Sequence, residues 1–528
     1  MTRGSFAVVV LLALATNVFA LRDETNQGRW NKPCETGPDA VVPGFLVNMG
    51  PTGARGILTK RSFVVKFIFT NTPAANVLKL DDEVYGANGK EFAEHTFGHK
   101  IHGIEGPIQD LGLAIEDSEG SDDGVLHLMV KRGEQKLTVN IQLEKLGRFG
   151  DSFSQDCKKL QILRARAYQY LMAHPGEVDS QGRCVETLAF LSSPDPEVFA
   201  AGKKLALSWN QPYNDQTWSW HLDFQGITLA EYYLLTKDKA VLPTLQSTCD
   251  LLRNCQWKAP NIVCWKLEEF TKKKIKVDQK TLQEHMDLYD GGFGHAPYTT
   301  VIVPRGGGGY GPMQWPTLLA IDTWQLGKLC GIQENHPGLD KAFVFLEHGT
   351  TVNGHVAYGG EFTLNGGPVD PEKWKTGRDN SDTFSAKDGL AYAAYMLSPE
   401  RSNSAAMMKL HLNHMDASYK DMTDGHADAL MGFTWGFAGV LASDDAALKR
   451  KISQYYIAWL NMSRCAGSDS YVILPGRDYA DFAYYNYGNI RNYTTASVAF
   501  IYSFATPRLH IQGVGHQSPF APATAFKN

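Results

Sequence analysis

The feature that most constrains the fold is a rhythm that fills the last two thirds of the chain. From about residue 155 to residue 515, amphipathic stretches of helical length alternate with connections rich in Gly and aromatic residues. An amphipathic helix has to bury its apolar face against a neighbour, and helical hairpins set side by side do this with simple connections. The rhythm therefore predicts one large all-α domain. The stretches concerned are 160–172, 185–191, 227–235, 242–252, 318–329, 390–397 and 452–460.

Residues 41–146 differ in pattern and indicate short strands and turns. Residues 63–69 form an apolar run of strand length, and residues 126–130 and 137–143 alternate apolar with other side chains. The stretch between the last two runs contains Gly133 and has the composition of a hairpin turn. A chain of 528 residues is too long for one hydrophobic core. We therefore expect a small β-rich module ahead of the helical domain.

The first twenty residues have the pattern of a secretory signal. Arg3 precedes an apolar run over residues 6–16, and small residues then lead to a cleavage site before Leu21. The run is too short for a bilayer span, which needs about 20 residues. We expect a secreted, extracellular protein. The predicted order is a signal peptide over 1–20, a lead-in over 21–40, the β-rich module over 41–146, the helical domain over 155–515 and a tail over 516–528.

Two further features are typical of the secretory route. Asn461 and Asn492 begin sequons without Pro and are predicted to be glycosylated. The chain has eight cysteines, which predicts some disulfides in an oxidising compartment; two of Cys249, Cys255 and Cys264 are close enough in sequence to pair. The alternative is that several are buried as small apolar residues. The formal net charge of -5 argues against nucleic-acid binding.

Residues 63–143 resemble a PDZ domain of secreted and periplasmic proteases. The similar segments are 72–75, 78–84 and 87–90, with Asp81 in place of the family's usual Gly. PDZ domains bind an extended peptide as an added strand and hold its terminal carboxylate with backbone N–H groups. The resemblance implies a peptide site in residues 50–58. The expected peptide-binding residues are Gly53, Gly56, Ile57 and Leu58; the alternative is that these glycines only make turns and the groove is filled.

The whole mature chain resembles a family of secreted proteins of unknown function that join a PDZ-like module to an α/α toroid. The similar segments are 157–163, 229–233, 307–311, Gly425 and His426 with the later Trp435, and 507–511. This resemblance implies a toroid of helical hairpins and a secreted protein, and it brings no assigned reaction. Residues 290–294 also resemble the Gly-aromatic loops of terpenoid-cyclase toroids, but the acidic motif of those enzymes is not matched.

Connections between helices carry the candidate catalytic residues. Polysaccharide-processing toroids use paired carboxylates or a Tyr/His pair, so we select His295, Tyr310, Asp379 and His426. His is the readiest acid or base near neutral pH, although a loop His bonded to backbone is the common alternative. The acidic residues have helix capping as their alternative role. Other candidates in these connections are Asp290, Tyr298, Asp382, Asp388 and Asp424.

His411 and His414 lie three residues apart, with Asp416 nearby, and share one face of a predicted helix. Because no third ligand is evident, we interpret them as a surface pair and predict no metal and no cofactor. The chain has no Gly-x-Ser-x-Gly elbow, no phosphate-binding Walker loop and no Cys-x-x-Cys pair. A protease role is therefore not inferred from the PDZ-like resemblance.

These observations predict a secreted protein that binds a peptide or a glycan, for example as an extracellular matrix component. The predicted partners are a peptide C-terminus or extended segment at the PDZ-like groove, or a glycan at the toroid cleft, with no nucleic acid and no membrane span. The alternative is a polysaccharide lyase or glycoside hydrolase that uses the cleft. A purely structural protein would instead have the cleft closed by aromatic side chains.

Overall fold

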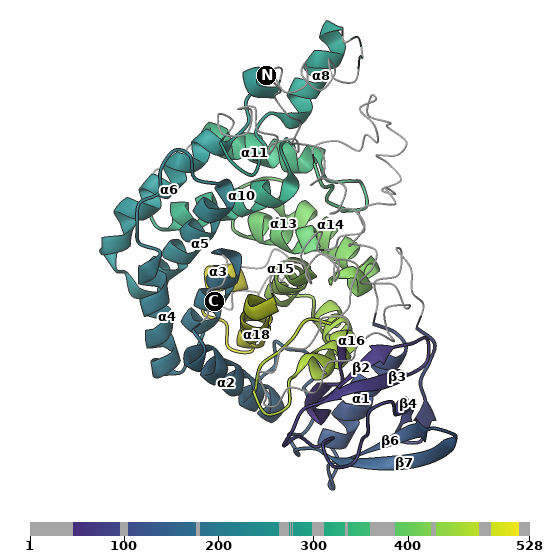
Figure 1. Ribbon diagram of the computed structural model, residues 1–528. Coiled ribbons are helices and arrows are strands. Elements are labelled where there is room, and N and C mark those ends of the chain that lie inside the picture. Colours follow the sequence, from purple (N-terminus) through teal and green to yellow (C-terminus); the bar gives the residue numbers. More distant parts are fainter. Residues whose placement is uncertain are drawn as a thin grey trace, which may run out of the picture.

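A computed structural model of the chain shows a small antiparallel sheet followed by a large helical region (Figure 1). It describes residues 46–95, 104–175, 180–262, 278–297, 311–332, 336–359, 386–423, 429–474 and 487–516, with the single residues 274 and 276. The predicted signal peptide, lead-in and C-terminal tail lie outside these residues or at their edge. The predicted fold class, a β-rich module followed by a helical domain, is confirmed.

The N-terminal module is one sheet with a single described helix against it. The strand order is β1-β2-β3-β4-β6-β7, with β5 paired to β4, and every pairing is antiparallel. The predicted hairpin is present, with Leu128 opposite Val139. The PDZ-like identity of this module stays a prediction. Its elements are β1 Val47–Asn48, β2 Ala54–Leu58, β3 Phe63–Ile68, β4 Glu83–Ala87, β5 Lys90–Glu91, α1 Pro107–Glu119, β6 Val125–Arg132 and β7 Gln135–Gln142.

The helical region consists of helices that alternate between an inner and an outer position. The inner helices are α3 Ser180–Leu191, α5 Ser219–Thr236, α10 Gln314–Leu329, α13 Ala386–Met396, α15 Ala429–Ala442 and α18 Tyr487–Ser503. The outer helices are α2 Lys158–Ala173, α4 Pro196–Ser208, α6 Leu242–Cys255, α11 His336–His348, α14 Ser404–Ala417 and α16 Ala446–Ser463, and α8 Gln279–Tyr289 extends from one end (Figure 1).

The inner helices close a ring. Each packs against the next in the order α3, α5, α10, α13, α15 and α18, and α18 packs back against α3. The outer helices lie against this ring, for example α4 against α3 and α5, and α14 against α13 and α15. A helix surrounded by others must be apolar on most of its faces. Accordingly α10 is buried from Gln314 to Gly327, and the ring has the arrangement of an α/α toroid.

Close packing inside the ring depends on small residues. A Cβ atom on Gly389 of α13 would lie 2.1 Å from the carbonyl oxygen of Trp435, and Gly439 of α15 meets Gly389 in the same way. Two glycines therefore let the backbones of α13 and α15 touch. The described helices include none that is long and apolar enough to cross a membrane.

The N-terminal module is joined to the ring through helix packing between α1 and α16 (Figure 1). Gly112 of α1 allows this approach, because a Cβ atom there would lie 2.4 Å from the carbonyl oxygen of Ala458. The Asn48 amide nitrogen donates to the carbonyl oxygens of Met462 and Arg464 at 2.6 and 2.7 Å. The sheet is therefore bonded directly to the end of α16.

The joint between the module and α16 also corrects the glycosylation predictions. Asn461 is fully buried, and its amide nitrogen donates to the Gly112 carbonyl at 3.1 Å and to Glu116 at 2.8 Å. Asn492 is also a buried residue, and its amide nitrogen donates to the His174 carbonyl at 2.7 Å. A glycan on either nitrogen would displace these bonds, so neither sequon fits a glycosylation site in the folded chain.

The cysteines that the structure describes are all free thiols. Cys249 and Cys255 are buried free thiols, so the expectation that two of Cys249, Cys255 and Cys264 pair is not met by these two. Burial raises the pKa of the Cys184 thiol to about 12, as it does for Cys330. These two residues match the alternative of small buried apolar side chains. Cys34 and Cys264 lie outside the described residues.

Candidate functional site

One face of the ring carries the long connections. Inner helices run on into outer ones through short turns, such as residues 237–241 and 443–445, so consecutive helices are antiparallel. Outer helices return to inner ones through longer segments, such as 256–313 and 349–385. The inner helices therefore all begin at the same face, which we call the start face. Connections positioned by a rigid scaffold are where binding residues are expected.

Of the four predicted catalytic residues, the structure describes His295. Tyr310, Asp379 and His426 lie outside the described residues, as do Tyr298, Asp382 and Asp424. Each of these lies in sequence in a connection that leads from an outer helix to an inner one. Asp290 is described and forms an ion pair with Lys341 at 2.5 Å. That pairing gives Asp290 a structural role beside α11.

His295 lies at the start of α5 between two tryptophans. Its carbonyl oxygen accepts a hydrogen bond from the Ser219 backbone N–H at 3.0 Å, and the Ser219 hydroxyl donates to the Gly294 carbonyl at 2.7 Å. The imidazole centroid is 5.9 Å from the ring centroids of both Trp218 and Trp220. Trp218 is 52% exposed. We call Trp218, Trp220 and His295 the aromatic group.

The hydrogen bond from Trp220 determines which nitrogen of His295 carries the proton. The Trp220 indole N–H donates to the Nδ1 of His295 at 2.8 Å, so this nitrogen is an acceptor and the proton of the neutral ring is on Nε2. Burial lowers the pKa of His295 below its ordinary value. The imidazole is therefore neutral at physiological pH. The group therefore places uncharged rings at the start face, with the indole of Trp218 exposed.

A second group at the start face joins α13 to α14. Asp388 lies in the first turn of α13, and its carboxylate is fully buried. It accepts hydrogen bonds from the Nδ1 of His411 at 2.9 Å and from the Nδ1 of His414 at 2.7 Å. The His355 ring stands edge-on to the His414 ring at 5.3 Å between centroids. We call Asp388, His411 and His414 the acid–imidazole group.

Electrostatics in the acid–imidazole group favour an ion pair between Asp388 and His414. Burial alone would raise the pKa of Asp388, but the charge of His414 and the bonds from both imidazoles outweigh it and leave that pKa below its ordinary value. Burial would lower the pKa of His414, but the Asp388 carboxylate outweighs it and raises the pKa. Burial, with the charges of Lys387 and His414, lowers the pKa of His355 to about 3. His355 is therefore neutral beside His414.

The interpretation of His411 and His414 as a surface pair is wrong. His411 is fully buried and His414 is largely buried, while Asp416 points away to an ion pair with Lys451 at 2.8 Å. The helical spacing of three correctly put both imidazoles on one face. Their partner Asp388 comes from another helix, which no local pattern reveals. Among the described residues, no set of three His, Cys, Asp or Glu side chains could hold a metal ion.

The four predicted peptide-binding residues do not form an open groove. β2 pairs with β3 on one edge, and on the other edge β1 places Val47 opposite Gly56. Ile57 and Leu58 are buried, Ile57 in a cluster with Leu46. Gly53 ends a short helical turn with φ of 80°, as the turn alternative expects. A peptide strand would have to displace β1, so the peptide prediction receives no support.

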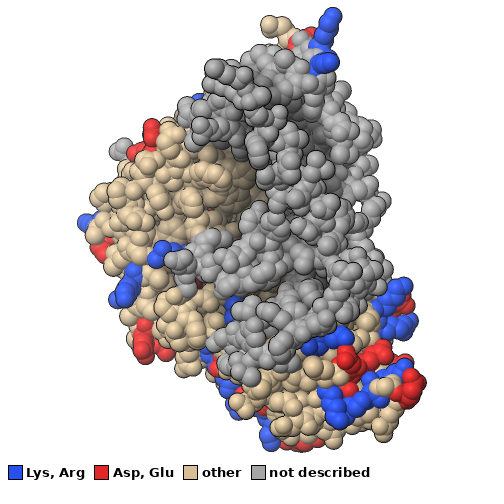
Figure 2. Space-filling model, viewed as in Figure 1, with Lys and Arg blue, Asp and Glu red and all other residues tan. Residues whose placement is uncertain are grey.

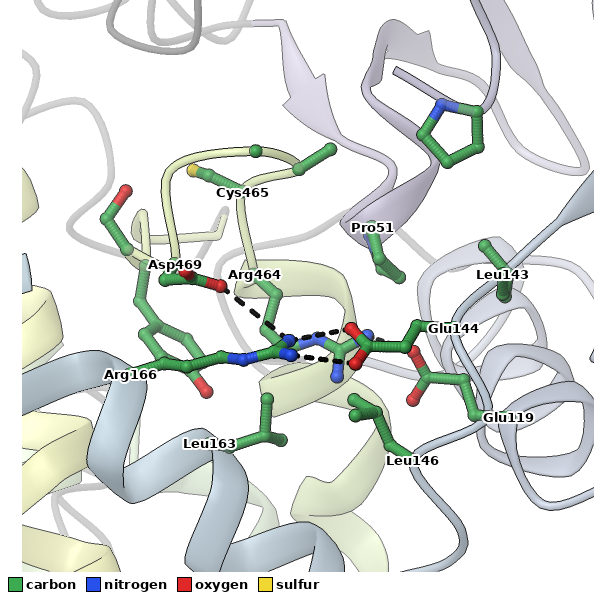
Figure 3. Close-up of a pocket in the computed structure, with 15 residues that line it drawn as sticks. Pro51, Glu119, Leu143, Glu144, Leu146, Leu163, Arg166, Arg464, Cys465 and Asp469 are labelled. Atoms are coloured by element: carbon green, nitrogen blue, oxygen red, sulfur yellow. Dashed lines mark hydrogen bonds and ion pairs between the residues drawn. The ribbon is translucent and has the colours of Figure 1, made fainter. Parts of the chain in front are cut away.

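A cavity of about 340 Å³ lies between the N-terminal module and the helical region (Figure 3). Its charged side chains are paired with one another across the joint. The Nη1 and Nη2 atoms of Arg166 each donate to the Glu144 carboxylate at 2.7 Å, and Arg464 donates to the Glu119 carboxylate. Because these charges are already matched, the cavity is part of the joint between the two regions.

Surface charge separates the module from the ring. In Figure 2 the Lys, Arg, Asp and Glu side chains gather over the N-terminal module, whereas fewer of them are seen over the described part of the helical region. Such a surface offers little attraction to a polyanion. The exposed indole of Trp218 belongs to the described part of the helical region and is better matched to a neutral polar ligand.

Comparison with known proteins gives a partial match. Residues 160–261, which run from the first turn of α2 to a point beyond α6, are similar to the family described as "Domain of unknown function (DUF6288)". No curated protein matches the chain. Among solved structures, the chain is similar to a family 76 glycoside hydrolase from a bovine Bacteroides thetaiotaomicron strain. The identity is 11% and the TM-score 0.44, over 72% of this chain and 83% of that one. At this level the likeness carries no argument about activity.

Proposed function

We propose that the chain is an exported protein that binds glycans at the start face, with the aromatic group as its contact surface. The observation that carries this proposal is the exposure of Trp218. The structure describes eight of the chain's tryptophans, and Trp218 is 52% exposed while most of the others are buried. The buried ones are Trp209, Trp257, Trp315, Trp324, Trp435 and Trp459.

An exposed indole on a rigid support suits carbohydrate chemistry. Pyranose rings have C–H faces that stack on aromatic rings, and their hydroxyls bond polar groups at the edge. Trp218 supplies the flat surface, and the Trp220–His295 bond fixes the polar part beside it. The bonds from Ser219 to the carbonyls of Gly294 and His295 hold the two segments together. A prearranged surface of this kind loses little entropy when it binds.

Export supports an extracellular glycan as the ligand. The signal-like pattern of residues 1–20 motivates this part of the proposal. Mass spectrometry of the protein from the culture medium would check it, with Leu21 as the expected first residue. Retention of Met1 on an intracellular protein would refute export without touching the binding site.

The proposal is tested with a glycan array followed by calorimetry on the best oligosaccharide. We expect Trp218→Ala to weaken binding at least about tenfold, which corresponds to about 1.4 kcal/mol, and Trp218→Phe to recover part of the loss. Leu329→Ala is the matched control, because Leu329 is a comparably exposed apolar residue at the end of α10, on the opposite face of the ring. Unchanged affinity in Trp218→Ala, or no glycan bound on the array, would reject the proposal.

A further inference from the structure

The acid–imidazole group has a geometry that glycan binding does not explain. A fully buried carboxylate holds two imidazoles by their Nδ1 atoms at the face where the inner helices begin. We propose that His414, held by Asp388, is the proton-transfer group of a hydrolytic centre that cleaves acyl esters carried by the bound glycan, with water as the nucleophile. The inference rests on the proposed function, which supplies the carrier of the ester.

The two imidazoles are not equivalent. The His411 side chain is fully buried, stacks on Tyr395 with 6.0 Å between centroids and has its Nδ1 within 3.2 Å of the Gly354 carbonyl. It is therefore a fixed support for Asp388. The His414 side chain is 15% exposed, and no described residue accepts from or donates to its Nε2. His414 is thus the imidazole that a ligand can reach.

The hydrogen bonds set the tautomer that a base requires. A neutral imidazole that donates its Nδ1–H to Asp388 carries its lone pair on Nε2. The carboxylate also stabilises the imidazolium that forms when Nε2 takes up a proton, as in known base–carboxylate pairs. Asp388 does not reach solvent and acts as a positioning residue for His414.

The charged and titratable groups around His414 come from every neighbouring element. They are Lys387 and Asp388 on α13, His411 on α14, His355 in the connection before α13, and Asp421 in the turn Tyr419–Asp421. Burial raises the pKa of Asp421 to about 6. Burial and the charge of Lys387 lower the pKa of His414, while Asp388 and Asp421 raise it. The balance leaves the pKa of His414 raised.

Hydrolysis of an ester can proceed with one proton-transfer group, which first accepts a proton and later returns it. The Nε2 of neutral His414 takes a proton from water as the water oxygen bonds to the ester carbonyl carbon, and the carbonyl electrons move onto its oxygen. The carbonyl then re-forms and the bond to the sugar oxygen breaks. That oxygen takes the proton from Nε2. One water and one ester give one carboxylic acid and one sugar hydroxyl, and His414 returns to its neutral form.

Glycosidic cleavage fits the same residues less well. Glycosidases place two carboxyl groups on the two sides of the scissile bond, free to act on it. The Asp388 carboxylate is fully buried and both of its oxygens are bonded to imidazoles. Ester hydrolysis needs only one group that takes up a proton and later returns it, and the imidazole of His414 can serve as that group.

The test measures acetate release from partially acetylated xylan and hydrolysis of p-nitrophenyl acetate. We expect wild-type activity to rise with pH through a midpoint above 6.5, because the neutral imidazole is the active form. His414→Gln should lower kcat/KM by at least about a hundredfold. Asp388→Asn should lower kcat and move the midpoint of the pH–activity profile to lower pH, because the carboxylate charge that raises the pKa of His414 is gone. His127→Gln is the control, since His127 is exposed on β6 and far in sequence from the group.

A second measurement keeps the result clear if Asp388→Asn folds poorly. Histidine ring signals, assigned by loss in His414→Gln, should titrate above 6.5 in the wild type. Full activity in His414→Gln, or no ester cleaved while glycans still bind, would overturn this inference and leave the proposed function intact. Ester cleavage that depends on His414 without any glycan binding would support the centre and reject the proposed function.

Discussion

Removing the Lys159 ammonium should destabilise the chain strongly. Lys159 is fully buried on α2 and pairs with both Glu116 and Glu119, while Arg464 pairs with Glu119. Two cations thus balance two carboxylates at the joint between the module and the ring. Lys159→Met keeps a long apolar side chain against Phe149, whose ring centroid lies 4.6 Å from the ammonium, and leaves one carboxylate without a counter-charge.

The magnitude follows from the burial of this network. Breaking a buried ion pair by removing one partner costs about 3–5 kcal/mol. Because Arg464 still faces Glu119, we expect the free energy of unfolding to fall by about 3 kcal/mol, near the lower end. Urea unfolding followed by circular dichroism and by tryptophan fluorescence measures this difference.

The neighbouring residue provides the control. Lys158 is exposed on the same helix, so Lys158→Met should change the free energy of unfolding by less than about 0.5 kcal/mol. Equal effects of the two substitutions would refute the reasoning. A stabilising effect of Lys159→Met would refute it as well, because it would mean that the desolvation of Lys159 outweighs its two ion pairs.

Two further predictions concern buried polar groups. Burial raises the pKa of Asp223 and of Asp322 well above the ordinary value, and the charge of Asp322 raises the pKa of Asp223 further. The folded chain therefore holds protons that the unfolded chain releases above about pH 4, and the free energy of unfolding falls as pH rises through this range. Asp322→Asn should stabilise the chain at pH 7 by at least about 1 kcal/mol and not at pH 3.5; equal effects at both would contradict the account. Peptides containing Asn461 should carry no glycan in the secreted protein, and mass spectrometry that finds one there would show that the described packing around α16 is wrong.

The sequence alone predicts the helical region well because its signals are local. Amphipathic spacing and Gly-rich connections mark most of the helices, and alternation marks the hairpin of β6 and β7. Closure of the ring depends on α18 meeting α3, although one helix begins at Ser180 and the other at Tyr487. No local pattern contains that contact.

The candidate sites could be predicted only in part. The spacing of His411 and His414 was informative, but Asp388 looked like a helix cap because its partners are on another helix. Asn461 matched a sequon because a three-residue pattern contains no information about burial. Trp218 could not be separated from the buried tryptophans, since exposure is decided by the whole fold.

The most direct test of the central claim is hydrogen–deuterium exchange with and without the best oligosaccharide from the array. The account predicts slower exchange in peptides that cover residues 218–221 and 292–297, where the aromatic group meets the start of α5. It predicts no change in peptides from β2, whose edges are already paired. Protection of β2 with none at the start of α5 would contradict the proposed binding surface.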